Sequence, residues 1–332
     1  MHTVCLIPGD GIGLEVVPAT RRLLEASGVA LAFEDAEAGW AAFEQHGTSV
    51  PDETLRKIRA CDATLAGAFT SPKRKVEGYR SAIVSMRREL ALFANLRPAR
   101  SRPLPGNVSG IDMLMVRENT EDLYVAVERR YGDIAIADSM VSRSASERIA
   151  HVALQHARRR RRRLDIVHKA NVLPVTSGLF LETVQAVAAQ YGDVHTSDII
   201  VDAAAMKLVR EPGSFDVLVA TNMFGDILSD LMAGLVGGLG VAPSANVGEH
   251  HAIFEPVHGS APDIAGSGAA NPTATMLSAA MMLDHLGESK AAQRLDRAVD
   301  RVLEHGPVTA DLGGDATTER YTDAVIDAYR AP

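Results

Sequence analysis

Two aspartates have the spacing of a metal site. Asp226 and Asp230 lie four residues apart in residues 221–230, TNMFGDILSD, and Asp202, after the apolar residues 199–201, could complete the ligand shell. Residues 221–230 are expected to begin a helix, where positions four residues apart share one face, so both carboxylates could bind one cation. Hard divalent ions such as magnesium prefer oxygen ligands and often take only one or two protein carboxylates. Acidic side chains are also favourable at a helix N-terminus without a ligand, and this second reading stays open.

Three arginines stand where they could bind a substrate with several carboxylates. Arg97 precedes a proline, Arg117 ends the apolar run 113–116, and Arg87 lies in a helix-like segment. A guanidinium group binds a carboxylate through two parallel hydrogen bonds, so three such groups brought together would suit a polycarboxylate. Each arginine taken alone is more typical of the protein surface.

Tyr124 and Lys169 are candidate proton carriers. Lys169 comes directly after His168, at the end of the apolar run 164–167, and Tyr124 follows Arg117 by seven residues. A lysine at the end of a buried strand can act as a base, because burial and neighbouring cations lower the pKa of an amine. His168 is interpreted as a structural residue.

The glycine-rich residues 8–13, PGDGIG, are similar to a dinucleotide-binding turn. They follow a predicted strand and precede a predicted helix, as such turns do. The pattern is incomplete, because Leu14 stands where glycine or alanine is required. The turn alone therefore gives little support for a nucleotide site.

The elements that must position these residues follow an α/β pattern. Strand-like runs at 4–7, 63–67, 113–116, 164–167 and 217–220 alternate with helix-like segments. Helix signals are Pro51 before residues 52–60, Gly28 after residues 14–27, and a capping box that begins at Ser144. The length of 332 residues suggests two compact lobes.

Composition narrows the class of protein. The formal net charge of −8 argues against nucleic-acid binding, and the arginine run 158–163 is interpreted as a solvated helix end. An RNA-binding alternative for that run would require strongly salt-dependent affinity.

Cys5 and Cys61 are too few for a disulfide framework, although a single bridge between them stays open. No secretory signal or membrane-length apolar segment is found, so a cytoplasmic protein without a membrane partner is expected.

Six motifs together resemble the β-decarboxylating dehydrogenases, the family of isocitrate, isopropylmalate and homoisocitrate dehydrogenases. The resemblance extends over nearly the whole chain. It is carried by GDGIG at 9–13, NLRP at 95–98, VRENTE at 116–121, HKAN at 168–171, residues 222–230, and HGSAPDIAG at 258–266.

The resemblance implies an isopropylmalate dehydrogenase-like layered α/β fold with two lobes, not a classical Rossmann fold. The larger lobe would comprise residues 1–97 and 246–332 and carry the nucleotide-binding loop. Residues 98–245 would form an inserted lobe with the metal site and the dimer contact. A homodimer or a dimer of dimers with shared active sites is expected.

The same resemblance assigns roles to individual residues. Asp226 and Asp230, with Asp202 of the partner subunit, would bind magnesium, for which manganese is an alternative. Lys169, also of the partner subunit, would remove the hydroxyl proton, and Tyr124 would help to protonate carbon after carbon dioxide is lost. The expected substrate-binding residues are Ser71, Val84, Arg87, Arg97, Arg117, Tyr124, Lys169 and Asn171.

A late loop would bind the nucleotide. Asp263 is expected to accept hydrogen bonds from the adenosine ribose, and NADP-using relatives carry lysine and tyrosine at the positions of Asp263 and Ile264. NAD is therefore the predicted coenzyme. The expected cofactor-binding residues are His258, Gly259, Ser260, Ala261, Asp263, Ile264 and Asn271.

Residues 70–84 are expected to accommodate the variable arm of the substrate. This segment is polar and basic, which favours an acidic arm that Ser71 or nearby cations such as Lys73 and Lys75 could meet. Val84, one helical turn before Arg87, would leave room for the extra methylene of homoisocitrate. The predicted reaction is NAD-dependent conversion of homoisocitrate to 2-oxoadipate and carbon dioxide, in lysine biosynthesis through 2-aminoadipate.

Two other functions stay open. The enzyme could use isocitrate, alone or together with homoisocitrate. A catalytically silent regulatory subunit is a second class, although every expected functional group is present. The sequence departs from common family wording at Asp122, Ala203 and Lys207, where glycine, asparagine and glutamine are frequent, and these changes put the local polarity near the metal in doubt.

Overall fold

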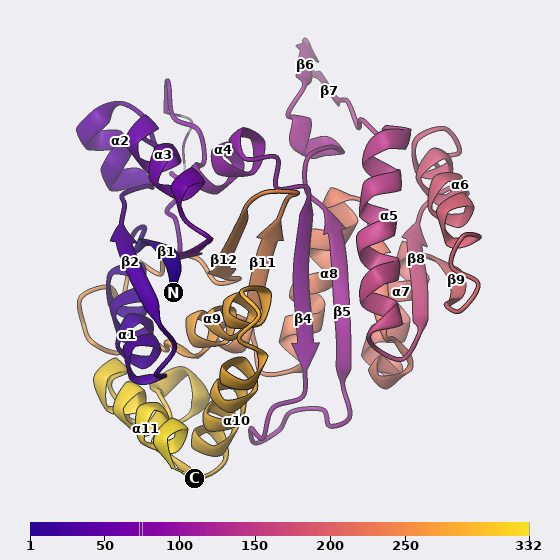
Figure 1. The fold of residues 1–332 in the computed structure, drawn as a ribbon. Helices are drawn as coiled ribbons and strands as arrows, with labels where there is room; N and C mark the ends of the chain where they lie inside the picture. The colour runs from indigo at the N-terminus through magenta and orange to yellow at the C-terminus, as the bar shows by residue number, and fades with distance from the viewer. Residues whose placement is uncertain (73, 75, 332) are drawn as a thin grey trace. The chain divides into compact units, whose positions relative to one another are not determined.

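The computed structural model describes residues 1–72, 74 and 76–331, which form two compact units (Figure 1). Unit 1 comprises residues 1–91, 102–107 and 237–332, and unit 2 comprises residues 92–101 and 108–236. Both units contain parallel strands and helices, so the predicted α/β class is confirmed. No helix of the described chain is long and apolar enough to cross a membrane. Cys5 and Cys61 are both free thiols.

The described residues of unit 1 contain five strands, in the order β2-β1-β3-β12-β11. The first four strands are parallel, and β11 pairs with β12 in antiparallel orientation. Helix α9 is buried along almost its whole length and packs beside α10, which in turn contacts α11 (Figure 1). The strands are β1 (His2–Ile7), β2 (Leu31–Asp35), β3 (Ala63–Ala66), β11 (Pro243–Val247) and β12 (Ala252–Pro256). The helices are α1 (Gly13–Ala26), α2 (Trp40–His46), α3 (Asp52–Ala60), α4 (Ala82–Glu89), α9 (Thr273–His285), α10 (Ser289–His305) and α11 (Thr318–Arg330).

In unit 2, five strands pair side by side in the order β4-β5-β10-β8-β9. Among these five, only the β4–β5 pair is antiparallel. Figure 1 shows α5 and α6 together in front of these strands, with α7 and α8 behind them. The strands are β4 (Ala94–Arg100), β5 (Asp112–Glu118), β8 (Arg163–His168), β9 (His195–Ile200) and β10 (Val217–Ala220), and a separate hairpin consists of β6 (Glu128–Tyr131) and β7 (Ile134–Ala137). The helices are α5 (Arg143–Arg158), α6 (Thr176–Ala188), α7 (Val201–Arg210) and α8 (Asn222–Leu235).

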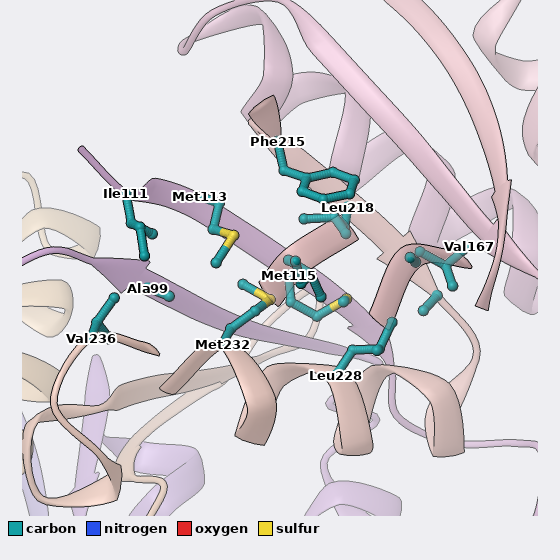
Figure 2. Packing of buried hydrophobic residues seen from close by; sticks show 13 residues of the cluster. Ala99, Ile111, Met113, Met115, Val167, Phe215, Leu218, Leu228, Met232 and Val236 are labelled. Carbon is teal, nitrogen blue, oxygen red and sulfur yellow. The ribbon is translucent and has the colours of Figure 1, made fainter. Parts of the chain in front are cut away.

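A buried apolar cluster fixes the rotation of α8 in unit 2. Leu228 and Met232 lie one helical turn apart and pack against Met113 and Met115 of β5 (Figure 2). Burial of each large apolar side chain contributes about 1.5–3 kcal/mol, so this face of α8 is strongly specified. The opposite side of the helix carries Asp226 and Asp230, the predicted metal ligands, and is directed away from the cluster.

The five predicted strands are present, but one helix start was misplaced. The runs at 4–7, 63–67, 113–116, 164–167 and 217–220 correspond to β1, β3, β5, β8 and β10, within two residues at their ends. The N-cap of α5 is Ser142, not Ser144: its backbone is extended and its hydroxyl accepts a hydrogen bond from the amide of Ala145 at 3.2 Å. Ser144 lies inside the first turn, so the capping-box prediction is wrong by two residues.

Candidate active site

Arg117 is the buried centre of a polar cluster in unit 2. It is the penultimate residue of β5, beside Ala220 of β10, and it is only 1% exposed. Its Nε and Nη2 donate to Oδ1 of Asn222 at 2.9 and 2.7 Å, and its Nη1 donates to Asp226. Asn222 is the first residue of α8, so the guanidinium group is bound by the first turn of that helix.

Gly225 allows this close packing. A Cβ atom at this position would lie 2.7 Å from Cγ and 2.8 Å from Cβ of Arg117. Real Cβ atoms do not approach so closely, so any larger residue would displace the stem of the arginine or the helix. Glycine is therefore required here because the Arg117 side chain lies too close for a Cβ atom, and not because of a turn conformation.

The two predicted metal aspartates do share one face of α8. Arg97 Nη1 lies 2.9 Å from Oδ1 of Asp230 and 3.3 Å from Oδ1 of Asp226, and it also donates to the Ser229 hydroxyl at 2.8 Å. Burial, and then the charge of Asp226, raise the pKa of the Asp230 carboxyl above its usual range, against the opposing charge of Arg97. The pair of acids is thus a place where added positive charge is favourable.

Tyr124 belongs to the same cluster. It lies in a short 3-10 helix, Leu123–Val125, and its hydroxyl donates to Oδ2 of Asp226. The guanidinium carbon of Arg117 lies 5.0 Å from the centre of the tyrosine ring. Burial raises the pKa of the phenol, and the hydrogen bond to Asp226 raises it further. The hydroxyl therefore keeps its proton at neutral pH and can serve as a proton donor.

Asp122 departs from the family in a way that the backbone explains. Its φ of +69° lies in the region that favours glycine, the residue frequent there in the family. The carboxylate accepts hydrogen bonds from the amide of Met223 at 2.9 Å and from the Ser139 hydroxyl at 2.7 Å. Asp122 thus satisfies an N-terminal amide of α8, which offsets part of the conformational strain.

Lys169 and Asp202 pair with each other in unit 2. Lys169 Nζ donates to Oδ1 of Asp202, whose side chain is 69% exposed, and this bond lowers the pKa of the carboxyl. The described residues contain no group of three acidic, histidine or cysteine side chains that could hold a metal. Asp202 therefore does not complete the Asp226–Asp230 pair within one chain.

Asn171 is exposed in the turn after Lys169. His168 forms a hydrogen bond with Asp198 at 3.1 Å, in agreement with a structural role.

Arg87 lies in a different setting, inside unit 1. Its Nε donates to Oδ1 of Asn246 at 2.9 Å, and its Nη2 lies 3.3 Å from Oε1 of Glu255. The amide of Asn246 also donates to that carboxylate oxygen at 2.7 Å. All three residues are at most 8% exposed, so they form a closed buried triangle that orients the guanidinium group. Glu255 and Asn246 were not predicted from the sequence.

The predicted nucleotide residues lie in a loop of unit 1. His258 is held by an Nδ1 contact of 3.0 Å to the Gly259 carbonyl, and burial lowers the pKa of its imidazole. Its Nε2 is buried without a hydrogen-bond partner among the described residues, so a polar ligand atom could satisfy it. Asp263 and Ile264 are exposed, whereas Asn271 is buried and donates to Asp311 at 2.9 Å. Ala261 has a φ of +38°.

The predicted substrate-arm residues lie on α4 and before it. Ser71 is exposed, and Val84 is half-buried on α4, one turn before Arg87. Lys73 and Lys75, which were expected to add positive charge, lie outside the described residues. A nearby cavity of unit 1, of about 800 Å³, is lined by Asp35, Glu37 and Glu53 and by none of the predicted site residues.

The arginine run is more than a solvated helix end. Arg160 Nε donates to the buried Asp216 at 2.9 Å, and the backbone amide of Arg161 donates to the same carboxylate at 2.8 Å. Arg158 pairs with Asp193 at 2.6 Å. The run does follow the end of α5 and is mostly exposed, as expected, but the sequence did not show that Asp193 and Asp216 pair with it.

Comparison with known proteins gives consistent results. Residues 3–325 match the isocitrate/isopropylmalate dehydrogenase family. The chain is 62% identical over 331 residues to an isocitrate/homoisocitrate dehydrogenase of Thermus thermophilus, with 99% of both sequences covered. It is 47% identical over 327 residues to 3-isopropylmalate dehydrogenase of Archaeoglobus fulgidus, with 98% of both covered. The solved structure of isocitrate dehydrogenase from Methylococcus capsulatus matches with a TM-score of 0.95 and 46% identity over 100% of both chains, which confirms the expected layered fold.

The Arg87 triangle predicts a large effect of Glu255 on stability. Glu255→Ala should lower the free energy of unfolding by about 3–5 kcal/mol, because it removes the carboxylate partner of a buried guanidinium group. Glu255→Gln should have a smaller effect, because it keeps an acceptor for Arg87 and Asn246. Urea unfolding would measure both, with Glu89→Ala as the control, since Glu89 pairs with Arg59 on the surface at 3.9 Å. An equal effect of Glu255→Ala and Glu89→Ala would contradict the prediction.

Proposed function

Because the chain belongs to the isocitrate/isopropylmalate dehydrogenase family, whose members are divalent-metal-dependent β-decarboxylating dehydrogenases that use NAD or NADP, we propose a specific reaction for it. The enzyme oxidises and decarboxylates homoisocitrate to 2-oxoadipate and carbon dioxide, with NAD as the oxidant and magnesium or manganese as the metal. Its place would be lysine biosynthesis through 2-aminoadipate. The alternative is an enzyme that uses isocitrate as its main substrate or uses both acids equally.

The observation that carries the chemistry is the cluster around Asp226. Two guanidinium groups, two carboxylates and one protonated phenol meet at the first turns of α8. Arg97 and Arg117 would bind substrate carboxylates through paired hydrogen bonds, and the family resemblance names Arg87 as a further substrate-binding arginine. Such a set suits a hydroxy tricarboxylate better than a monocarboxylate.

Asp226 and Asp230 are proposed to hold the metal. Their oxygen donors suit a hard divalent cation. Burial, and then the charge of Asp226, raise the pKa of the Asp230 carboxyl, so a bound cation would stabilise its charged form. Asp202 of the partner subunit is proposed as the third acid. A bound divalent ion would polarise the substrate hydroxyl and the adjacent carboxylate, and bound NAD would accept the hydride.

Two side chains are proposed to move protons. Lys169 Nζ of the partner subunit takes the proton from the substrate hydroxyl as the carbonyl forms. After the β-carboxylate leaves as carbon dioxide, the Tyr124 hydroxyl donates a proton to the carbon that carried it. Burial and the hydrogen bond to Asp226 keep that proton on the phenol until then.

The coenzyme is proposed to be NAD. Asp263 is exposed and carries a negative charge, which would accept hydrogen bonds from ribose hydroxyls and repel an added phosphate. Ile264, 43% exposed beside it, has no positive charge to attract that phosphate. The buried and unpartnered Nε2 of His258, judged among the described residues, is consistent with a polar ligand at this loop.

Shared sites would require a dimer, and one apolar face supports it. Met206 and Val209 of α7 and Ile227 of α8 are 58%, 59% and 62% exposed, although large apolar side chains favour burial. Val175, in the segment that follows Lys169, is 81% exposed. We propose that a second copy covers this face, in a homodimer or a dimer of dimers, and so brings Lys169 and Asp202 to the neighbouring site.

The choice of homoisocitrate is supported by α4 and by one relative. Val84 is small and uncharged, which would leave room for the longer acidic arm and give no cation to the shorter one. The 62% identical relative carries both isocitrate and homoisocitrate in its name. Some activity with isocitrate is expected, since one methylene is worth only about 1–3 kcal/mol of discrimination.

A substrate panel tests the reaction. With magnesium, NADH formation from NAD should be fastest with homoisocitrate, slower with isocitrate and slowest with isopropylmalate, and NADP should be a poor substitute. Lys169→Ala and Asp226→Asn should each lower kcat by about 10²–10⁴-fold, whereas the surface substitution Lys290→Ala should not. No turnover with any hydroxy acid would favour a silent regulatory subunit, and near-normal turnover by either site variant would refute the assigned roles.

Mixing two inactive variants tests the shared site. Lys169→Ala protein keeps Tyr124, and Tyr124→Phe protein keeps Lys169, so a mixed dimer would contain one complete site. After subunit exchange, statistical mixing should restore about a quarter of wild-type activity. Mass spectrometry of the mixture would verify exchange. Verified exchange without any recovery would argue against sites built from two chains.

Val84 should control the choice between the two acids. Val84→Arg adds a cation that can reach the shorter arm, so the kcat/KM ratio of isocitrate to homoisocitrate should rise about tenfold or more. Val84→Met lengthens the side chain without a charge and serves as the control. If both variants change the ratio equally, size and not charge determines specificity.

A further inference from the structure

Asp10 joins three segments of unit 1. Its carboxylate is 6% exposed and accepts hydrogen bonds from the amides of Trp40 and Ala41, at 2.8 and 3.1 Å, where α2 begins. The same carboxylate accepts a third bond, at 2.8 Å, from the amide of Thr70. The glycine-rich turn at 9–13 is therefore bound directly to the start of the substrate-arm segment 70–84.

The glycines of this turn serve contacts within the protein. A Cβ atom on Gly9 would lie 2.3 Å from the Ala68 carbonyl oxygen, and one on Gly11 would lie 2.1 Å from the Ser260 carbonyl oxygen. The amide of Ile12 donates to that Ser260 oxygen at 2.9 Å. In a dinucleotide-binding turn, glycines permit close approach to a pyrophosphate, whereas here they permit close approach to two other loops.

One side-chain bond links the two ligand-binding segments themselves. The Thr70 hydroxyl donates to the Ser260 hydroxyl at 2.7 Å. Ser260 lies in the proposed nucleotide loop and is 6% exposed, while Thr70 directly precedes Ser71 of the substrate arm. The Tyr79 hydroxyl donates to the Thr70 carbonyl at 2.6 Å, so a residue nine positions later is tied to the same point.

Aromatic rings pack together at Tyr79, in the later part of this segment. The rings of Trp40, Phe43 and Tyr79 lie 5.2–5.6 Å apart in pairs. Tyr79 is thus held to α2 by ring contacts, and Thr70 is held to the nucleotide loop by its hydroxyl. A nucleotide that orders the loop at Ser260 would, through Thr70, reduce the entropy that the substrate arm loses when the hydroxy acid binds.

We propose that Thr70 is a positioning residue, and that its hydrogen bond to Ser260 couples nucleotide binding to substrate binding. This inference rests on the proposed function, because it assigns residues 258–264 to the nucleotide and residues 70–84 to the substrate arm. The coupling is reciprocal: each ligand tightens the binding of the other by the same factor.

NADH fluorescence titration measures the coupling without turnover. The dissociation constant of NADH is determined with magnesium, in the absence and in the presence of homoisocitrate. The coupling factor is the value without homoisocitrate divided by the value with it. Wild-type protein should give a factor of about five or more. Thr70→Val and Ser260→Ala each remove one hydroxyl of the bond and should lower the factor about fivefold, the value of one neutral hydrogen bond.

The double variant and a matched control make the result specific. Thr70→Val combined with Ser260→Ala should lower the factor no further than either change alone, because both remove the same bond. Ser267→Ala removes a hydroxyl from a neighbouring position, where it donates to the Ile264 carbonyl at 2.5 Å, and should leave the factor unchanged. Ser260→Ala tests the bond from its other end if Thr70→Val does not fold.

The outcomes distinguish a failure of the proposed function from a failure of the proposed role of Thr70. Failure of wild-type protein to bind NADH and homoisocitrate would refute the proposed function. If both ligands bind but wild-type protein shows no coupling, or the single variants keep the wild-type factor, the role of Thr70 is refuted while the function stands. An additive loss in the double variant would likewise refute transmission through this one bond.

Discussion

The burial of Arg117 at the end of β5 is the constraint on which the candidate site depends. A guanidinium group with 1% exposure requires partners for its donors, and α8 supplies them through Asn222 and Asp226. This requirement fixes the start of α8 against the sheet, while Leu228 and Met232 fix its rotation. The positions of Asp230 and Arg97 then follow from helix and strand geometry. Charge satisfaction and apolar packing therefore specify one arrangement together.

The sequence predicted what depends on local periodicity. Strands such as β5 and β10 were found because apolar runs of four or more residues stand between helix signals. The shared face of Asp226 and Asp230 followed from their four-residue spacing alone, and Arg97 does contact both. The roles of these residues came from family resemblance and remain predictions, because geometry alone does not identify a ligand.

Long-range partners could not be predicted in the same way. Glu255 and Asn246 are separated from Arg87 by more than 150 residues, and no local pattern marks them as its partners. Asp216 was missed for the same reason, so the arginine run was interpreted without its carboxylate. The weak match of residues 8–13 to a dinucleotide turn was informative, since the glycines there meet carbonyl oxygens of the protein.

Gly225 has a consequence for any attempt to make this protein more heat-resistant. Replacing a glycine inside a helix by alanine commonly adds about 0.5–1 kcal/mol of stability, so a design procedure guided by helix propensity would select this position. The methyl group would meet the stem of Arg117 at 2.7 Å. Helix propensity would increase, but the added methyl group would displace the buried Arg117 side chain from its position against α8. The absence of a side chain at this position is thus a condition for the packing of Arg117, so helix propensity and site geometry cannot be optimised independently.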